Sequence, residues 1–216
     1  MHTLPSLHAF LGIAGVALGM VLLPGPNMVY LVSRSLSQGR RAGLVSLLGV
    51  LLGFVGYLVA VTAGIAAVFA AVPVLYTGLK LAGALYLLRL AVHMVRPGGR
   101  AVFEARELPP DSPRRLFTMG LLTCLLNPKI ALMYLSLLPQ FVDPTRGHVG
   151  EQSLLLGLTQ IAVAVSVNGA IAVGAAGVAG FLSRRPAWLR LQRRLMGTAL
   201  AVFAVRLATD RSSAAV

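Results

Sequence analysis

The chain has 216 residues, of which 57% are hydrophobic and only 12% are charged, with a net charge of +13. A soluble domain carries about 25% charged residues, so this composition excludes an ordinary soluble domain and indicates a polytopic membrane protein. The basic residues cluster in three short segments between apolar runs: Arg34 to Arg41, Arg96 to Arg115 and Arg184 to Arg194. Membrane topology explains that placement, and we expect no nucleic-acid partner.

The apolar runs predict the membrane spans. A membrane helix needs roughly 20 mostly apolar residues. The sequence therefore predicts an all-α polytopic membrane protein with six transmembrane helices, near residues 7–33, 42–69, 72–95, 116–141, 153–182 and 192–209. The sixth span is the weakest, because Arg206 lies near the end of a short apolar core, so a five-span alternative stays open. The first run lacks a basic segment before it and is expected to be a retained span rather than a signal peptide.

The basic segments predict the orientation, since cytoplasmic loops are enriched in lysine and arginine. Segments 34–41, 96–115 and 184–194 are rich in arginine, whereas the connections at 70–72 and 142–152 hold only one basic residue between them. Strict alternation places the three basic segments in the cytoplasm and both termini outside.

Because each half holds three spans, this alternation gives the two halves of the single transmembrane transporter domain, residues 1–216, opposite orientations. The halves are residues 1–95 and 116–216, and the polar segment 96–115 is their cytoplasmic linker. A 3+3 inverted repeat is a common plan among secondary transporters. Such a plan predicts a matching feature in each half.

Each half has a broken first helix. The interruptions, which we take as the substrate-binding and translocation residues, are Pro24, Gly25, Pro26 and Asn27 in the first span, and Asn127, Pro128 and Lys129 in the fourth. Paired interruptions are the best sequence-level indication of a transporter binding site. Because Asn is a strong N-cap and Pro favours the first helical position, each interruption predicts a helix restart, with Gly25 and Asn127 as the caps.

The two restarts are expected to converge near the midplane. Each would offer free backbone N–H groups and the positive end of a helix dipole, which suits a carboxylate. Lys129 would add a full positive charge beside it. An α-ammonium could be met by carbonyls left unpaired at the breaks and by the oxygens of Asn27 or Asn127. The alternative is a pair of proline kinks that only bend the helices for packing.

At these residues the sequence resembles the LysE/RhtB family of bacterial amino-acid exporters. The resemblance runs through PGPNMVYLVSRSLSQGRRAGLVSLLGVLLG at 24–53, LKLAGALYLLRLAVHMVR at 79–96 and FTMGLLTCLLNPKIALMYLSLLPQFV at 117–142. It implies a six-helix exporter of the bacterial plasma (inner) membrane that moves amino acids or close derivatives outward, driven by the proton gradient. Arg89 departs from the pattern, which leads us to expect an aromatic or small apolar residue there.

The acidic residues narrow the substrate class. All six lie in loops or at chain ends: Glu104, Glu107, Asp111, Asp143, Glu151 and Asp210. A cationic side chain in the membrane would need an anionic partner, so neutral amino acids resembling threonine, homoserine or leucine are favoured. Export of cationic amino acids or of another small zwitterion stays open, as does a passive channel. Asp143 is a candidate for proton coupling, with a solvated end group as the alternative.

The remaining residues predict no catalytic, metal or cofactor site. Cys124 is the only cysteine, which excludes an intrachain disulfide and a thiolate metal site. The expected partners are the amino-acid substrate and the lipid bilayer. The pairs Gly15/Gly19 and Gly49/Gly53 permit close helix packing, within one chain by default and on a homodimer face as the alternative. Asn168 could line the path, but an interhelical hydrogen bond is the stronger expectation.

Overall fold

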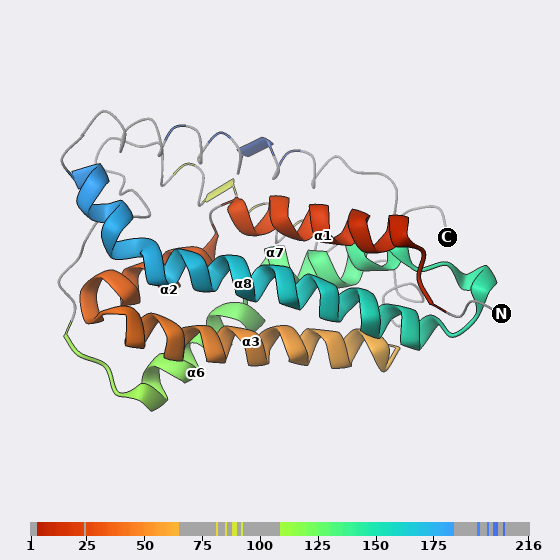
Figure 1. Cartoon of the computed structure of the whole chain (residues 1–216), viewed down its shortest axis with the longest axis horizontal. Helices are drawn as coiled ribbons and strands as arrows, with labels where there is room; N and C mark the ends of the chain where they lie inside the picture. Colours follow the sequence, from red (N-terminus) through yellow and green to blue (C-terminus); the bar gives the residue numbers. More distant parts are fainter. Residues whose placement is uncertain are drawn as a thin grey trace.

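Helices that lie side by side with roughly parallel axes make up the computed structural model of the protein (Figure 1). It describes residues 4–23, 25–64 and 109–183, and ten isolated residues: 81, 85, 88, 89, 92, 194, 198, 201, 202 and 205. The elements are α1 (Leu7–Leu22), α2 (Pro26–Gln38), α3 (Arg40–Thr62), α6 (Pro113–Leu125), α7 (Pro128–Leu132), the π-helix η1 (Met133–Leu137), the 3-10 helices η2 (Leu138–Phe141) and η3 (Pro144–Arg146), and α8 (Val149–Ser183).

The all-α membrane fold is confirmed. Helix α3 and the segment Val149–Ala175 of α8 are each long and apolar enough to cross a membrane, and so are the bent pairs α1–α2 and α6 to η2 when each is counted as one span. These four correspond to the predicted first, second, fourth and fifth spans. The predicted spans 72–95 and 192–209 lie largely outside the described residues, as do Pro24 and most of the linker. The inverted repeat and the position of the termini therefore stay predictions.

The predicted loop 34–41 is wrong in its extent. Helix α2 continues to Gln38, and α3 begins at Arg40. Gly39 alone joins them, with a φ of 85° that suits glycine because it has no side chain to clash. Arg34 is therefore a helical residue, and its guanidinium can reach another element.

Helices α3 and α6 approach so closely that only glycine fits between them. A Cβ on Gly49 would stand 2.0 Å from the carbonyl oxygen of Phe117, and one on Gly120 would stand 2.2 Å from that of Ser46. The Gly49/Gly53 pair thus packs within the chain, as expected by default. Gly15 and Gly19 have no neighbour within 4 Å that an added Cβ would meet.

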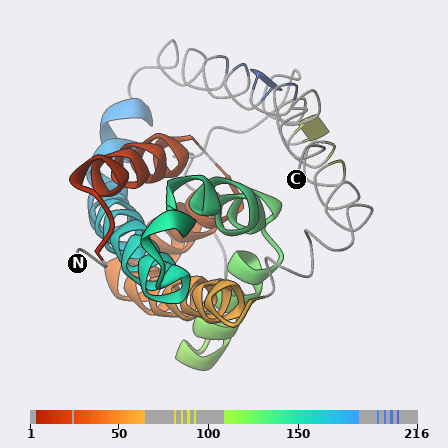
Figure 2. The ribbon, with the colours of Figure 1, turned by 90° about the vertical axis from the view of Figure 1, so that its right-hand side faces the viewer.

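Helix α8 is the longest element, and it lies between α1 and α3 in both views of the ribbon (Figures 1 and 2). Its 35 residues span about 52 Å at 1.5 Å per residue, which exceeds the roughly 30 Å of bilayer hydrocarbon. The fully buried core includes Ile13, Leu31, Phe54 and Leu156, contributed by α1, α2, α3 and α8. Large aliphatic side chains are exposed along the outer face of α3, at Leu44, Leu48, Leu52, Val55 and Val59. A bilayer suits such a surface.

Candidate functional site

The two predicted breaks are confirmed, together with their caps. The pair α1–α2 bends by 56° and the pair formed by α6 and the segment Pro128–Phe141 bends by 51°. Helix α2 restarts with Gly25 as its N-cap and Pro26 as its first residue. Helix α7 restarts with Asn127 and Pro128 in the same positions.

The second restart differs from expectation, because its first N–H groups are occupied. The side-chain oxygen of Asn127 accepts the backbone N–H of Lys129 at 3.1 Å. The carbonyl of Asn127 accepts those of Ile130 and Ala131 at 3.0 and 3.1 Å. The prediction of free N–H groups at this restart is therefore wrong, because Asn127, which caps the helix, also accepts its first backbone N–H groups. At the first restart no side chain caps α2, and its first turn supplies no internal acceptor for the N–H of Asn27.

Lys129 reaches from the second break into the first. Its Nζ donates to the carbonyl oxygens of Met20 at 2.9 Å and Leu23 at 2.7 Å, at the end of α1, and the residue is only 5% exposed. These carbonyls form the negative end of the α1 dipole, which stabilises a cation. The ammonium thus occupies carbonyls that the sequence offered to the substrate. Two of its three N–H donors are used, and one is left for another acceptor.

The two restarts are joined directly by their asparagines. The Nδ2 of Asn127 donates to the Oδ1 of Asn27 at 3.1 Å, across 100 residues of sequence, and both side chains are buried. Because the N–H of Lys129 can only donate, it fixes Oδ1 of Asn127 toward itself. Asn127 must then present Nδ2 to Asn27, and Asn27 turns its own Nδ2 away. That donor has no hydrogen-bond partner within the described residues, although the thiol of Cys124, a weak acceptor, lies beside it.

A small cavity lies beside these residues. It holds about 20 Å³, close to the space that one water molecule needs. Four polar residues, Asn27, Lys129, Gln160 and Asn168, line it, and none of its lining residues is acidic. The rest of the lining is apolar: Ala17, Met20, Val21, Met28, Phe54, Ile130, Met133 and Ala164.

Helix α8 contributes two of the four polar residues: Asn168, for which lining the path was the weaker of two expectations, and Gln160, which the sequence did not assign to the site. Gln160 accepts the hydroxyl of Tyr134 at 2.6 Å. Asn168 donates from Nδ2 to the carbonyl of Ala164 at 2.9 Å, within its own helix. The expected interhelical bond of Asn168 is therefore not the one that forms. The spacing of Gln160 and Asn168 could have indicated that both line the same site, because residues eight apart lie on one face of a helix.

The second break is also capped by a side chain from another helix. Tyr57 of α3 donates its hydroxyl to the carbonyl of Leu125, at the end of α6, at 2.7 Å. Its ring stacks on that of Tyr134 in the π-helix η1, with the centroids 5.6 Å apart. A single turn of π-helix inside a span is frequent at functional sites. The carbonyl ends of both breaks are thus partnered, one by Lys129 and one by Tyr57.

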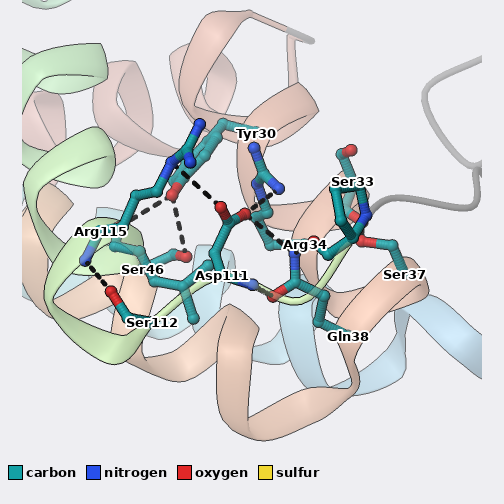
Figure 3. A network of polar contacts seen from close by, with 11 residues as sticks. Tyr30, Ser33, Arg34, Ser37, Gln38, Ser46, Asp111, Ser112 and Arg115 are labelled. Carbon is teal, nitrogen blue, oxygen red and sulfur yellow. Dashed lines mark hydrogen bonds and ion pairs between the residues drawn. The ribbon is translucent and has the colours of Figure 1, made fainter.

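A second polar cluster ties α2 to the start of α6 (Figure 3). The carboxylate of Asp111, whose side chain is 7% exposed, pairs with Arg34, with the Nε of Arg115 at 3.0 Å and with the Nε2 of Gln38 at 3.0 Å. The hydrogen bond from Gln38 and the two arginines hold the pKa of Asp111 below its ordinary value, against the opposing effect of burial. Sequence reasoning missed this cluster because Arg34 and Asp111 are 77 residues apart.

Asp143 lies at the end of the fourth span and does not line the cavity. Its side chain is 45% exposed and its Oδ1 accepts the N–H and the hydroxyl of Thr145 at 3.0 and 2.6 Å. Arg146 donates to the other oxygen at 3.1 Å. The pKa of Asp143 is lowered, mainly by the hydrogen bonds from Thr145. This geometry is that of a cap on η3.

The comparisons with known proteins cover nearly the whole chain. The family model of the LysE type translocators matches residues 18–211. A leucine efflux protein of Salmonella typhimurium is 30% identical over 200 residues, which are 91% of this chain and 92% of that protein, and one of Salmonella typhi matches equally. An uncharacterized membrane protein of Pseudomonas aeruginosa is 31% identical over 205 residues, or 88% and 90% of the two chains. No solved structure matches.

Proposed function

We propose that this chain, which belongs to the family of LysE type translocators, is a secondary exporter of neutral amino acids in the bacterial inner membrane. The family is one of translocators, which supports a transporter rather than an enzyme. One observation carries the choice of substrate: the cavity where the two broken helices meet is lined by a buried ammonium, three amides and apolar side chains, and none of the described residues that line it is acidic. The leucine efflux proteins among its relatives support an aliphatic substrate.

The carboxylate of the substrate binds at the breaks in this proposal. The remaining N–H of Lys129 and the Nδ2 of Asn27 are the donors that the site offers. Both side chains are at least nine-tenths buried, so their hydrogen bonds to a carboxylate form in a low-dielectric setting and are strong. The cavity must widen from its present 20 Å³ to admit an amino acid, as expected of a carrier that opens and closes around its substrate.

The apolar part of the lining holds the side chain of the substrate. Phe54, Ile130 and Met133 face the cavity together with smaller residues of α1 and α8. An aliphatic side chain gains about 25 cal/mol for each Å² removed from water there. A lysine or arginine side chain would find no anion among the described residues that line the cavity, and an unpaired charge in a membrane interior is expensive.

Coupling to the proton gradient and the arrangement as a single inverted-repeat domain with both termini outside are part of the same proposal. They rest on the family resemblance and on the distribution of arginine. Asp143 is the acidic candidate for coupling, but its bonds to Thr145 and Arg146 favour the alternative of a solvated cap. A homodimer is the alternative to a functional monomer.

Counterflow into liposomes tests the proposal. The purified protein is reconstituted with internal unlabelled amino acid, and uptake of labelled leucine, threonine, homoserine, lysine and arginine is measured. Uptake of the neutral amino acids, lost in Lys129→Ala and retained in Arg146→Ala, supports the proposal. Arg146 is the matched control, because its side chain is 39% exposed, donates to Asp143 and does not line the cavity.

Two results would overturn parts of the proposal. Faster exchange of lysine than of leucine would make the chain an exporter of cationic amino acids. Uptake that never exceeds the equilibrium concentration, under an imposed proton gradient, would make it a passive channel. Absence of exchange with any amino acid would remove amino-acid transport altogether.

A further inference from the structure

Four oxygens at the breaks that could receive an α-ammonium already accept from other donors. The carbonyls of Met20 and Leu23 accept from the ammonium of Lys129. The Oδ1 of Asn27 accepts from Asn127, and the Oδ1 of Asn127 accepts the backbone N–H of Lys129. Among the described residues, the side-chain groups left over at the breaks are donors, which suit the carboxylate of a zwitterion. A side-chain acceptor for its ammonium that has no other partner comes from another element.

Asn168 of α8 supplies one. Its side chain is 3% exposed and lines the cavity, and its Oδ1 has no hydrogen-bond partner within the described part of the chain. The orientation of the amide is fixed by chemistry: the carbonyl of Ala164 can only accept, so Nδ2 faces it and Oδ1 turns away. A buried acceptor without a partner is rare and requires an explanation.

We propose that Oδ1 of Asn168 accepts a hydrogen bond from the α-ammonium of the transported amino acid. This inference rests on the proposed function. It places the two ends of the zwitterion on different elements, with the carboxylate at the broken helices and the ammonium on α8. The site then selects free α-amino acids and rejects α-keto acids and N-acylated amino acids, which lack the ammonium.

The size of the cavity agrees with this assignment. Its 20 Å³ suffices for one water molecule or one ammonium group. Without substrate, a water molecule can satisfy Asn168, and the ammonium of an entering amino acid displaces it. The apolar lining on the same cavity is then left for the substrate side chain.

Competition by two close analogues tests the assignment. Leucine and its α-keto acid, 4-methyl-2-oxopentanoate, share the carboxylate and the side chain and differ at the α position. Each is titrated against counterflow of labelled leucine in wild type, Asn168→Leu and the control Thr159→Val. Thr159 bonds to the carbonyl of Leu155 in the same helix, as Asn168 does to Ala164, but it does not line the cavity.

The wild type and Thr159→Val are expected to prefer leucine. In Asn168→Leu this preference should fall by about tenfold or more, as for the loss of a hydrogen bond to a charged group. The change should come from weaker leucine binding, with the keto acid unaffected. An unchanged preference in Asn168→Leu, or equal weakening of both competitors, would overturn the inference while leaving amino-acid transport in place.

A measurement on the wild type alone guards against a variant that fails to fold. The trimethylated betaine of leucine carries the positive charge but has no N–H to donate. It is expected to compete at least tenfold more weakly than leucine. If the betaine or the keto acid competes as well as leucine, no acceptor in the site forms a hydrogen bond with the ammonium, and the inference is wrong. Absence of leucine exchange by the wild type would instead refute the proposed function.

Discussion

A Cβ on Gly25 would stand 2.9 Å from the Nζ of Lys129, so a side chain at residue 25 would force the end of the lysine to shift. The backbone of Gly25 is extended, with φ −154° and ψ −177°, which any residue can adopt. Glycine at this position therefore leaves room for the ammonium of Lys129 and is not needed for the backbone conformation. The first break, at Gly25, and the second break, which carries Lys129, are therefore in close contact here.

Gly25→Ala is expected to reduce transport at least tenfold, because the added methyl group pushes the ammonium of Lys129 off the carbonyls of α1. Gly25→Val should be more severe. Only the end of a flexible side chain has to move, so expression and helix content should stay near wild type. Counterflow and circular dichroism measure the two effects. The control is Gly19→Ala, which meets nothing within 4 Å; equal transport by both variants would show that the contact is unimportant.

Lys129→Met is expected to lower stability as well as transport. The substitution keeps the bulk of the side chain but leaves the carbonyls of Met20 and Leu23 without their donor. An unsatisfied buried carbonyl costs about 1–3 kcal/mol. Unfolding by a denaturing detergent measures the loss, with Arg146→Met for comparison. Unchanged stability would mean that water replaces the lysine at these carbonyls.

Two substitutions of Asn127 should separate the cap from the contact with Asn27. Ser caps a helix nearly as well as Asn, whereas Ala does not, and loss of a cap costs about 0.5–2 kcal/mol. Asn127→Ser should therefore be more stable than Asn127→Ala. Neither can donate an amide N–H to Asn27, so both should lose transport. Full activity of Asn127→Ser would show that Asn27 needs no fixed orientation.

The breaks could be predicted because their chemistry is local: Gly-Pro and Asn-Pro each place a cap directly before a favoured first residue. The described spans followed from hydropathy in the same way. The partners of Lys129 could not be read from the sequence, since they lie 106 and 109 residues away. Nor could the extent of α2, because Gly39 makes a one-residue joint where a basic loop was expected.

Asp111 should contribute to stability without adding a pH-dependent step near neutrality. Its folded pKa lies below the ordinary value of 3.8, so the folded protein binds this proton less readily than the unfolded chain. The stabilisation is fully present above about pH 5 and is lost as pH falls through the folded pKa. The stability difference between wild type and Asp111→Asn should be constant from about pH 5 to 8 and shrink below about pH 4. Glu151→Gln, at a side chain that is 66% exposed, is the control; a difference that changes between pH 6 and 8 would contradict this assignment.

Asp143→Asn distinguishes a proton carrier from a cap. Its lowered pKa keeps the carboxylate ionised at physiological pH, and its oxygens bond to Thr145 and Arg146. We therefore expect the variant to keep counterflow and to lose little of any gradient-driven export. Efflux is measured with and without an imposed pH gradient. Retention of counterflow together with complete loss of gradient-driven export would identify Asp143 as the coupling residue.

The glycine contacts between α3 and α6 constrain how such a carrier can move. Backbone touches backbone at Gly49 and Gly120, so at these two positions no side chain lies between the helices that could change rotamer as they slide. In the proposed division of the chain, α3 falls in residues 1–95 and α6 mostly in residues 116–216, so rocking of one half against the other would have to shear this backbone-to-backbone contact. We therefore expect α3 and α6 to move together as one frame during transport, and the helices to bend at the two breaks beside it.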